Sequence, residues 1–118
     1  MDLKAWQEGH RLVLAIYKAT KEFPRDEQFG LTNQISRSAV SVTSNISEGF
    51  SRQFSKEKTQ FYAIALGSLT ELQNQIFIAK DVEYLSEPDF QKIAEQTIVV
   101  SKIINGLIKS SISINRNT

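Results

Sequence analysis

The carboxylate whose position is most informative is that of Glu71, in the second half of the chain. The residues seven positions before and after Glu71 are both isoleucines, so on a helix the three side chains share one stripe. An unpaired carboxylate on an apolar stripe is costly. We therefore expect Glu71 to accept hydrogen bonds from Ser68 and from Ser44, Asn45 or a backbone amide of the preceding helix. This pattern favours a structural acceptor over a catalytic acid or base.

Metal and nucleophilic chemistry lack the residues that they need. The chain has no cysteine, which excludes disulfides and Cys-ligated metals. A di-iron carboxylate bundle uses Glu-x-x-His motifs on inward faces, but no acidic residue stands three positions before His10, which is the only histidine. Glu48 lies off the apolar stripe of its own helix, and the five glycines are too scattered for a phosphate loop. We predict no metal, no cofactor and no enzymatic activity, and we interpret His10 as structural or interfacial.

Basic residues give the one indication of a nucleic-acid partner. Those that could contact phosphates form two groups, Lys4, Arg11 and Lys18, and then Arg52, Lys56 and Lys58. The first three recur every seven residues, so they form one exposed stripe on a helix. Phe50 and Phe54 are interleaved with the second group and could stack on bases, although such aromatic residues more often close the end of a bundle. The chain has 14 Lys+Arg against 13 Asp+Glu, so this electrostatic signal is weak.

The spacing of apolar residues predicts four helices over about 3–22, 30–49, 56–82 and 87–110. Phe23-Pro24 should end the first, Gly49 the second, and Ser86 should cap the fourth. The polar tail over 111–118 should be loose. Short connections favour antiparallel neighbours, so the expected fold class is all-α, a single-domain, antiparallel up-down-up-down four-helix bundle. The residues expected to face inward from the first helix are Trp6, His10, Val13, Tyr17 and Thr20.

The length and composition favour a soluble single-domain protein, and the apolar faces of the third and fourth helices favour self-association. The chain has 118 residues, 41% of them hydrophobic, enough for one core. It shows neither a signal-peptide pattern nor an 18-residue apolar run, so we expect a cytoplasmic protein that does not enter a membrane. Gly67 indicates close approach of another backbone. A second apolar surface, which another copy would cover, is predicted from Tyr62, Leu66, Phe77 and Val99.

Four segments in order carry a family resemblance. They are Leu3-Lys4-Ala5-Trp6-Gln7, Phe29-Gly30-Leu31-Thr32, Ser44-Asn45-Ile46-Ser47-Glu48-Gly49 and Ala65-Leu66-Gly67-Ser68-Leu69-Thr70-Glu71-Leu72. Together they resemble the bacterial four-helix bundle family that includes proteins encoded in intervening sequences of 23S ribosomal RNA genes. The chain departs from the family pattern at Thr43, where members often carry proline, and at Ser36-Arg37, where they often carry two arginines.

The resemblance implies a closed bundle that assembles into a ring, most simply a homopentamer. It also implies similarity to the accessory variability proteins of retroelements, whose basic barrels bind nucleic acid and a reverse transcriptase. The family has no defined activity, so its recurring positions are expected to be structural rather than catalytic. Those positions are Ser44, Asn45, Ile46, Glu48, Gly49, Gly67, Ser68, Glu71 and Leu72.

Two functions follow from these patterns. The first is a non-enzymatic oligomer that binds RNA, or another nucleic acid, through the six basic residues, alone or together with a nucleic-acid enzyme. The alternative is a scaffold oligomer with a protein partner and no nucleic acid, which would use an apolar patch left exposed after the oligomer closes.

Overall fold

The computed structural model describes residues 4–117, and the side chains of residues 4–113. In this part of the chain the secondary structure is entirely helical, which confirms the all-α class and the four helices. The elements are α1 (Lys4–Thr20), a 3₁₀ turn η1 (Arg25–Glu27), α2 (Leu31–Ser51), α3 (Ser55–Asp81) and α4 (Glu87–Asn117). No helix within residues 4–117 is long and apolar enough to cross a membrane.

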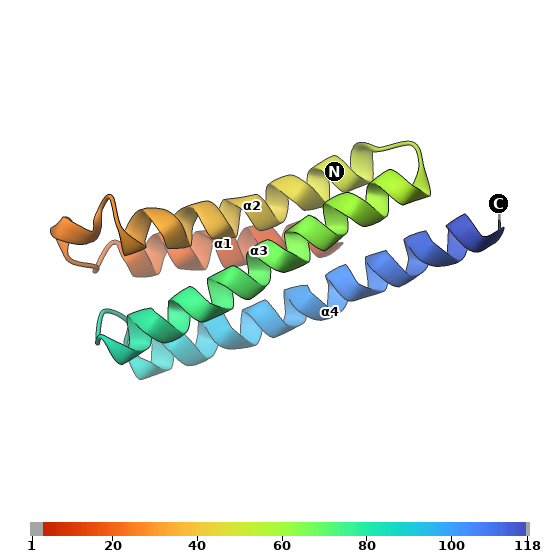
Figure 1. Ribbon diagram of the computed structural model, residues 1–118. Coiled ribbons are helices and arrows are strands. Elements are labelled where there is room, and N and C mark those ends of the chain that lie inside the picture. Colours follow the sequence, from red (N-terminus) through yellow and green to blue (C-terminus); the bar gives the residue numbers. More distant parts are fainter. Residues whose placement is uncertain (1–3, 118) are drawn as a thin grey trace.

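The four helices surround one elongated core. α2 packs against α1 and α3, and α4 packs against α3 and α1. The short connections lie at alternating ends of a body measuring 51 × 24 × 22 Å (Figure 1). The largest side chains with almost no exposed surface come from every helix, among them Leu12, Ile35, Leu72 and Ile104.

The helix ends follow from local chemistry. Thr20 ends α1 shortly before Pro24, as expected. Oγ of Ser86 accepts a 3.3 Å hydrogen bond from the amide of Asp89 and so caps the first turn of α4. After α3 the chain turns at Glu83, whose φ of 69° lies in the left-handed region.

The expectation of a loose tail over 111–118 is wrong up to Asn117, because α4 continues to that residue. After Gly106 the sequence contains neither glycine nor proline that would end a helix. Ser111 is also buried, so packing holds the helix beyond residue 110.

The inner face of α1 is rotated from the expected one. His10 and Tyr17 are exposed, and Trp6 and Val13 are only partly buried. The buried residues are Ala5, Gly9, Leu12, Ile16 and Thr20. The reason is close packing on α2: a Cβ atom at Gly9 would lie 2.9 Å from Cγ2 of Thr43. Small residues, which a pattern of large apolar side chains ignores, therefore mark the contact between α1 and α2.

The predicted second apolar surface is only partly exposed. Tyr62 is buried against Gly49, where a Cβ atom would lie 2.6 Å from the tyrosine ring, and Leu66 is partly buried against the core. Phe77 and Val99 are exposed, by 52% and 39%. Nothing lies within 4 Å of a Cβ atom placed at Gly67, so no other part of the described chain approaches that glycine.

Candidate nucleic-acid interface

The outer face of α1 carries the first basic group. Lys4, Arg11 and Lys18 are all exposed, and Lys21 is exposed directly after the helix. Arg11 forms a 3.5 Å ion pair with Glu8, but the Arg11 side chain is 74% exposed and that of Glu8 only 16%. The cation of this pair therefore faces solvent while its carboxylate is largely covered. By contrast, the carboxylate of Glu22 is exposed and lines the same hollow as Lys18.

The second basic group is partly used within the chain. Nη2 of Arg52 lies 2.9 Å from the carboxylate of Glu48, and its guanidinium lies 4.6 Å from the centroid of the Phe61 ring. Nζ of Lys58 donates to the carbonyl oxygens of Gly49 and Phe50, at 3.2 and 2.8 Å. A lysine in this position satisfies carbonyl groups at the end of a helix. Arg52 and Lys58 thus stabilise the turn between α2 and α3.

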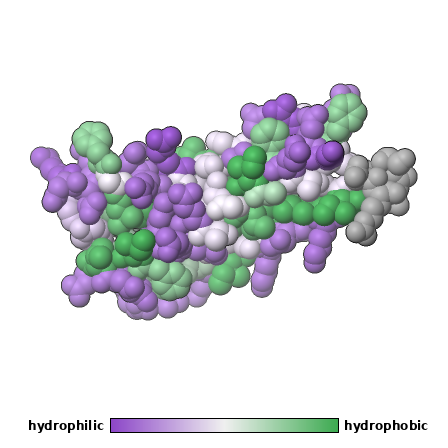
Figure 2. All heavy atoms as spheres, viewed as in Figure 1, coloured by the Kyte–Doolittle hydropathy of each residue, from purple (hydrophilic) through white to green (hydrophobic). Residues whose placement is uncertain are grey.

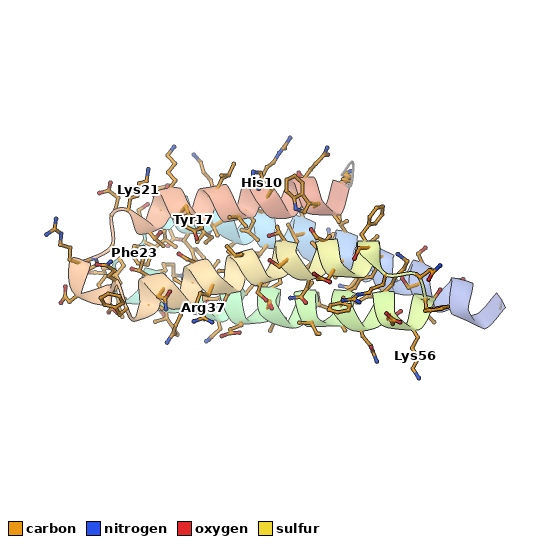
Figure 3. All side chains as sticks on the ribbon, turned by 90° about the horizontal axis from the view of Figure 1, so that it is seen from above. His10, Tyr17, Lys21, Phe23, Arg37 and Lys56 are labelled. Carbon is orange, nitrogen blue, oxygen red and sulfur yellow. The ribbon has the colours of Figure 1, made fainter. Side chains whose placement is uncertain are left out.

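The two basic groups do not form one surface. Lys56 is exposed and has no partner among the described residues. In Figure 3 Lys56 extends from the start of α3, on the side opposite to α1 and its exposed His10. Phe50 and Phe54 are exposed by 47% and 64%, and Lys58 lies over the Phe50 ring at 5.5 Å.

Two of the positions expected from the family resemblance, Asn45 and Ser68, belong to a hydrogen-bond network between α2 and α3. Oγ of Ser68 lies 2.8 Å from Oγ of Ser41. The side-chain amide of Asn45 donates to the carbonyl oxygen and to Oγ of Ser41, at 2.8 and 3.1 Å. Ser41 therefore joins Asn45 to Ser68, and sequence reasoning missed it. Its position four residues before Asn45, one helical turn, was the available signal.

Glu71 is not the buried acceptor that we expected. Its side chain is exposed and accepts one hydrogen bond, from Nε2 of Gln75 at 3.3 Å. The stripe that it shares with Ile64 and Ile78 was correctly inferred, but those isoleucines are themselves 51% and 43% exposed. The stripe of Ile64, Glu71 and Ile78 on α3 therefore faces outward, and not toward the core as predicted.

His10, the one histidine of the sequence, lies beside an aromatic ring of its own helix. The imidazole of His10 stacks on the indole of Trp6, with centroids 4.8 Å apart and planes inclined by 11°. No hydrogen bond to His10 is formed within the described residues. In the same part of the chain, no three potential ligands cluster closely enough to hold a metal ion.

The fold and site define a class of protein: an all-α chain whose four described helices surround one core and present a basic face on α1. The chain belongs to the 23S rRNA-intervening sequence protein family, whose model matches residues 1–106. It is similar in structure, with a TM-score of 0.80, to a protein of unknown function from the S23 ribosomal protein family of Bacteroides thetaiotaomicron VPI-5482. The two sequences are 21% identical, and the match covers 89% of this chain and 98% of the other. At that identity the likeness shows a shared fold alone. The search of curated proteins found no match.

Proposed function

We propose that this protein is a non-enzymatic, oligomeric helical bundle that binds RNA through the outer face of α1. The name of its family refers to an intervening sequence of 23S ribosomal RNA, which makes a ribosomal RNA segment the partner to test first. Such a partner would be met in the cytoplasm.

The observation that carries this proposal is the charge distribution on α1. Lys4, Arg11 and Lys18 repeat along about 21 Å of helix, at a rise of about 1.5 Å per residue, and all three are exposed. The carboxylate of Glu8, which pairs with Arg11, is largely covered, whereas that of Glu22, four residues after Lys18, is exposed. Cations spaced along a rod suit phosphates spaced along a nucleic-acid backbone, and binding of this kind weakens as salt rises.

Self-association is supported by apolar side chains that the chain leaves uncovered. On the face seen in Figure 2, several apolar patches alternate with polar side chains. Apolar patches rimmed by polar residues are places where another copy of a chain can bind. We propose that the four helices form a closed antiparallel bundle and that copies assemble into a ring, most simply of five. A ring would repeat the α1 face and raise avidity for RNA without any new contact. The exposed apolar residues of the four helices include Leu14, Val40, Ile64, Phe77, Ile98 and Val99.

A protein partner is the second candidate function, and Phe77 favours it. Its exposed ring packs on Phe90 with centroids 4.9 Å apart, and the ammonium group of Lys80 lies over both rings, at 5.5 and 4.5 Å. Aromatic residues, phenylalanine among them, are enriched at protein interfaces. If this surface stays open after assembly, a partner protein would bind there.

Light scattering with and without a structured 23S ribosomal RNA fragment, at low and at high salt, tests the proposal. A multimer that gains RNA mass at low salt and loses it at high salt supports RNA binding. A multimer that gains no RNA mass even at low salt excludes this RNA as its partner and favours the protein scaffold. A mass equal to that of the single 13.4 kDa chain would contradict self-association.

A further inference from the structure

Two surface grooves border α2 and share three of its residues. The groove between α1 and α2 has a volume of about 340 Å³, and the groove between α2 and α3 about 530 Å³. Asn33, Arg37 and Ser41 line both, so the grooves meet over α2. Figure 3 looks onto this helix, with α1 and α3 on either side. The α1–α2 groove is completed by Tyr17, Ser36, Val40 and Ser44.

Charge distinguishes the α1–α2 groove from its neighbours. Arg37 is the one charged residue among those that line it. The α2–α3 groove adds the exposed carboxylate of Glu71. A third hollow, between α1 and α4, contains Glu22 and Asp89 beside Lys18 and Lys92. A polyanion therefore meets only positive charge in the α1–α2 groove and carboxylates in the other two.

Tyr17 gives this groove an aromatic surface. Its side chain is 49% exposed and forms no hydrogen bond or ring contact within the described residues. Lys21 follows four residues later, just after the end of α1, and Figure 3 shows Tyr17 between α1 and α2. An exposed aromatic ring next to cations is the arrangement on which bases of single-stranded nucleic acids stack.

Arg37 provides the matching phosphate contact. It is exposed and forms no ion pair within the described residues. Its planar guanidinium can bind a phosphate with two hydrogen bonds. The exposed side chains of Asn33 and Ser44 line the same groove and can donate to phosphate or sugar oxygens.

We propose that the α1–α2 groove holds a nucleotide of a single-stranded nucleic acid. Tyr17 stacks on its base, Arg37 binds a neighbouring phosphate, and the α1 cations hold the backbone that leads away from the groove. A duplex is a poorer ligand because its bases are stacked on one another and do not offer a free face to Tyr17. This inference rests on the proposed function and specifies the class of nucleic acid.

The test is a fluorescence-anisotropy titration with a short single-stranded RNA, the single-stranded DNA of the same sequence and the matching RNA duplex. Tyr17→Leu should weaken single-strand binding by about tenfold, and Tyr17→Phe should keep it. Arg37→Gln should reduce the slope of log affinity against log salt by about 0.7. Phe29→Leu is the matched control, because Phe29 is an exposed aromatic residue that lines the groove containing Glu71. Circular dichroism of each variant checks that it folds.

Three outcomes would contradict nucleotide binding in the α1–α2 groove. Tyr17→Leu could bind as the unchanged protein does, or Phe29→Leu could lose as much affinity as Tyr17→Leu. The third outcome is that the duplex binds as tightly as the single strand. Equal binding of the RNA and the DNA supports the groove and shows that it reads base and phosphate rather than the 2′-hydroxyl. If Arg11→Glu/Lys18→Glu abolishes binding and the groove variants do not weaken it, the α1–α2 groove is not the nucleotide site, and the proposed function stands. If the unchanged protein binds none of the three ligands at low salt, both are wrong.

Discussion

The hydroxyl of Tyr84 donates a 3.0 Å hydrogen bond to Oε2 of Glu27, which precedes it by 57 residues. The other oxygen of this carboxylate, Oε1, accepts a 3.2 Å hydrogen bond from the amide of Leu31. Glu27 therefore caps the first turn of α2 and also binds Tyr84 in the turn between α3 and α4. The Tyr84 ring packs on buried Phe23, with centroids 5.6 Å apart. One carboxylate thus joins two connections at this end of the molecule.

Because of this hydrogen bond, we expect the stability of the fold to decrease in the alkaline pH range. The bond to Glu27, followed by burial and by the charges of Glu27 and Asp26, raises the pKa of Tyr84 above its usual value of 10.0. Because the folded-state pKa is the higher one, the stabilisation is complete below pH 10 and is lost as pH rises through the raised pKa. We expect Tyr84→Phe to lower the melting temperature at neutral pH, and the difference from the unchanged protein to shrink above pH 10.

Thermal melts of both proteins from neutral to alkaline pH provide the measurement. Burial also raises the pKa of Tyr62, but Tyr62 is present in both proteins and its effect cancels in the difference. Tyr17→Phe, at an exposed tyrosine, is the control and should melt like the unchanged protein. A difference that stays constant through the alkaline range would show that the hydrogen bond from the Tyr84 phenol to Glu27 is not its source.

Two glycines should respond in opposite directions to alanine. At Gly49 the new methyl group would lie 2.6 and 2.8 Å from ring carbons of Tyr62 and 3.2 Å from Cβ of Phe61. We expect Gly49→Ala to lower the free energy of unfolding by about 1–3 kcal/mol. Gly67 has open space around it inside α3, so Gly67→Ala should raise stability by about 0.5–1 kcal/mol.

Urea denaturation of the two variants measures these changes. If Gly67→Ala destabilises the protein and also reduces its mass in solution, a second copy packs at Gly67, and the close backbone approach expected from the sequence occurs between chains. Equal destabilisation by both variants without a change of mass would contradict the packing described here.

Lys56 and Lys58 should differ in how much their charge contributes to stability. Lys58→Met removes the hydrogen bonds to the carbonyl oxygens of Gly49 and Phe50, and we expect a loss of about 1 kcal/mol. Lys56→Met removes an exposed charge that has no partner in the described structure, so its effect should stay within about 0.5 kcal/mol. Chemical denaturation at low salt is the measurement. A larger loss of stability in Lys56→Met than in Lys58→Met would contradict the structural role assigned to Lys58.

A buried threonine links α3 to α4. Oγ1 of Thr97 donates to the carbonyl oxygen of Ala94 at 2.6 Å and accepts from Nε2 of Gln73 at 3.1 Å. Thr97 is 1% exposed, so Thr97→Val leaves the Gln73 amide without its acceptor and should cost about 1–3 kcal/mol. Gln73→Leu in the same chain should recover part of that loss. Strictly additive losses in this double-mutant cycle would show that the two side chains do not interact.

The sequence predicted the helices better than their faces. Pro24 and Ser86 act through local backbone chemistry, so the helix ends near them could be inferred from neighbouring residues. The rotation of α1 could not, because it depends on the fit of Gly9 against Thr43 of another helix. Glu71 shows the same limit: periodicity placed it on a stripe with two isoleucines, but only the packing of α3 on its neighbours decides whether that stripe faces the core or solvent.

The basic residues show what spacing can and cannot reveal about a site. A seven-residue repeat within one helix was enough to place Lys4, Arg11 and Lys18 on one exposed face. The partners of Arg52 and Lys58, namely an adjacent carboxylate and the carbonyl oxygens at the end of α2, become visible only with the turn in place. Tyr17 and Arg37 stand twenty positions apart in the sequence, and they line one groove because α1 packs on α2.

The proposal that the α1 face binds RNA is tested most directly by reversing its charge. Binding of a labelled 23S ribosomal RNA fragment at low salt is compared for the unchanged protein, Arg11→Glu/Lys18→Glu and Lys102→Glu/Lys109→Glu. The second pair makes the same change of net charge at exposed positions of α4. The expected result is that reversal on α1 abolishes binding, with helicity retained, while reversal on α4 weakens it only slightly. Unchanged binding by Arg11→Glu/Lys18→Glu, or equal loss in both double variants, would contradict an RNA-binding face on α1.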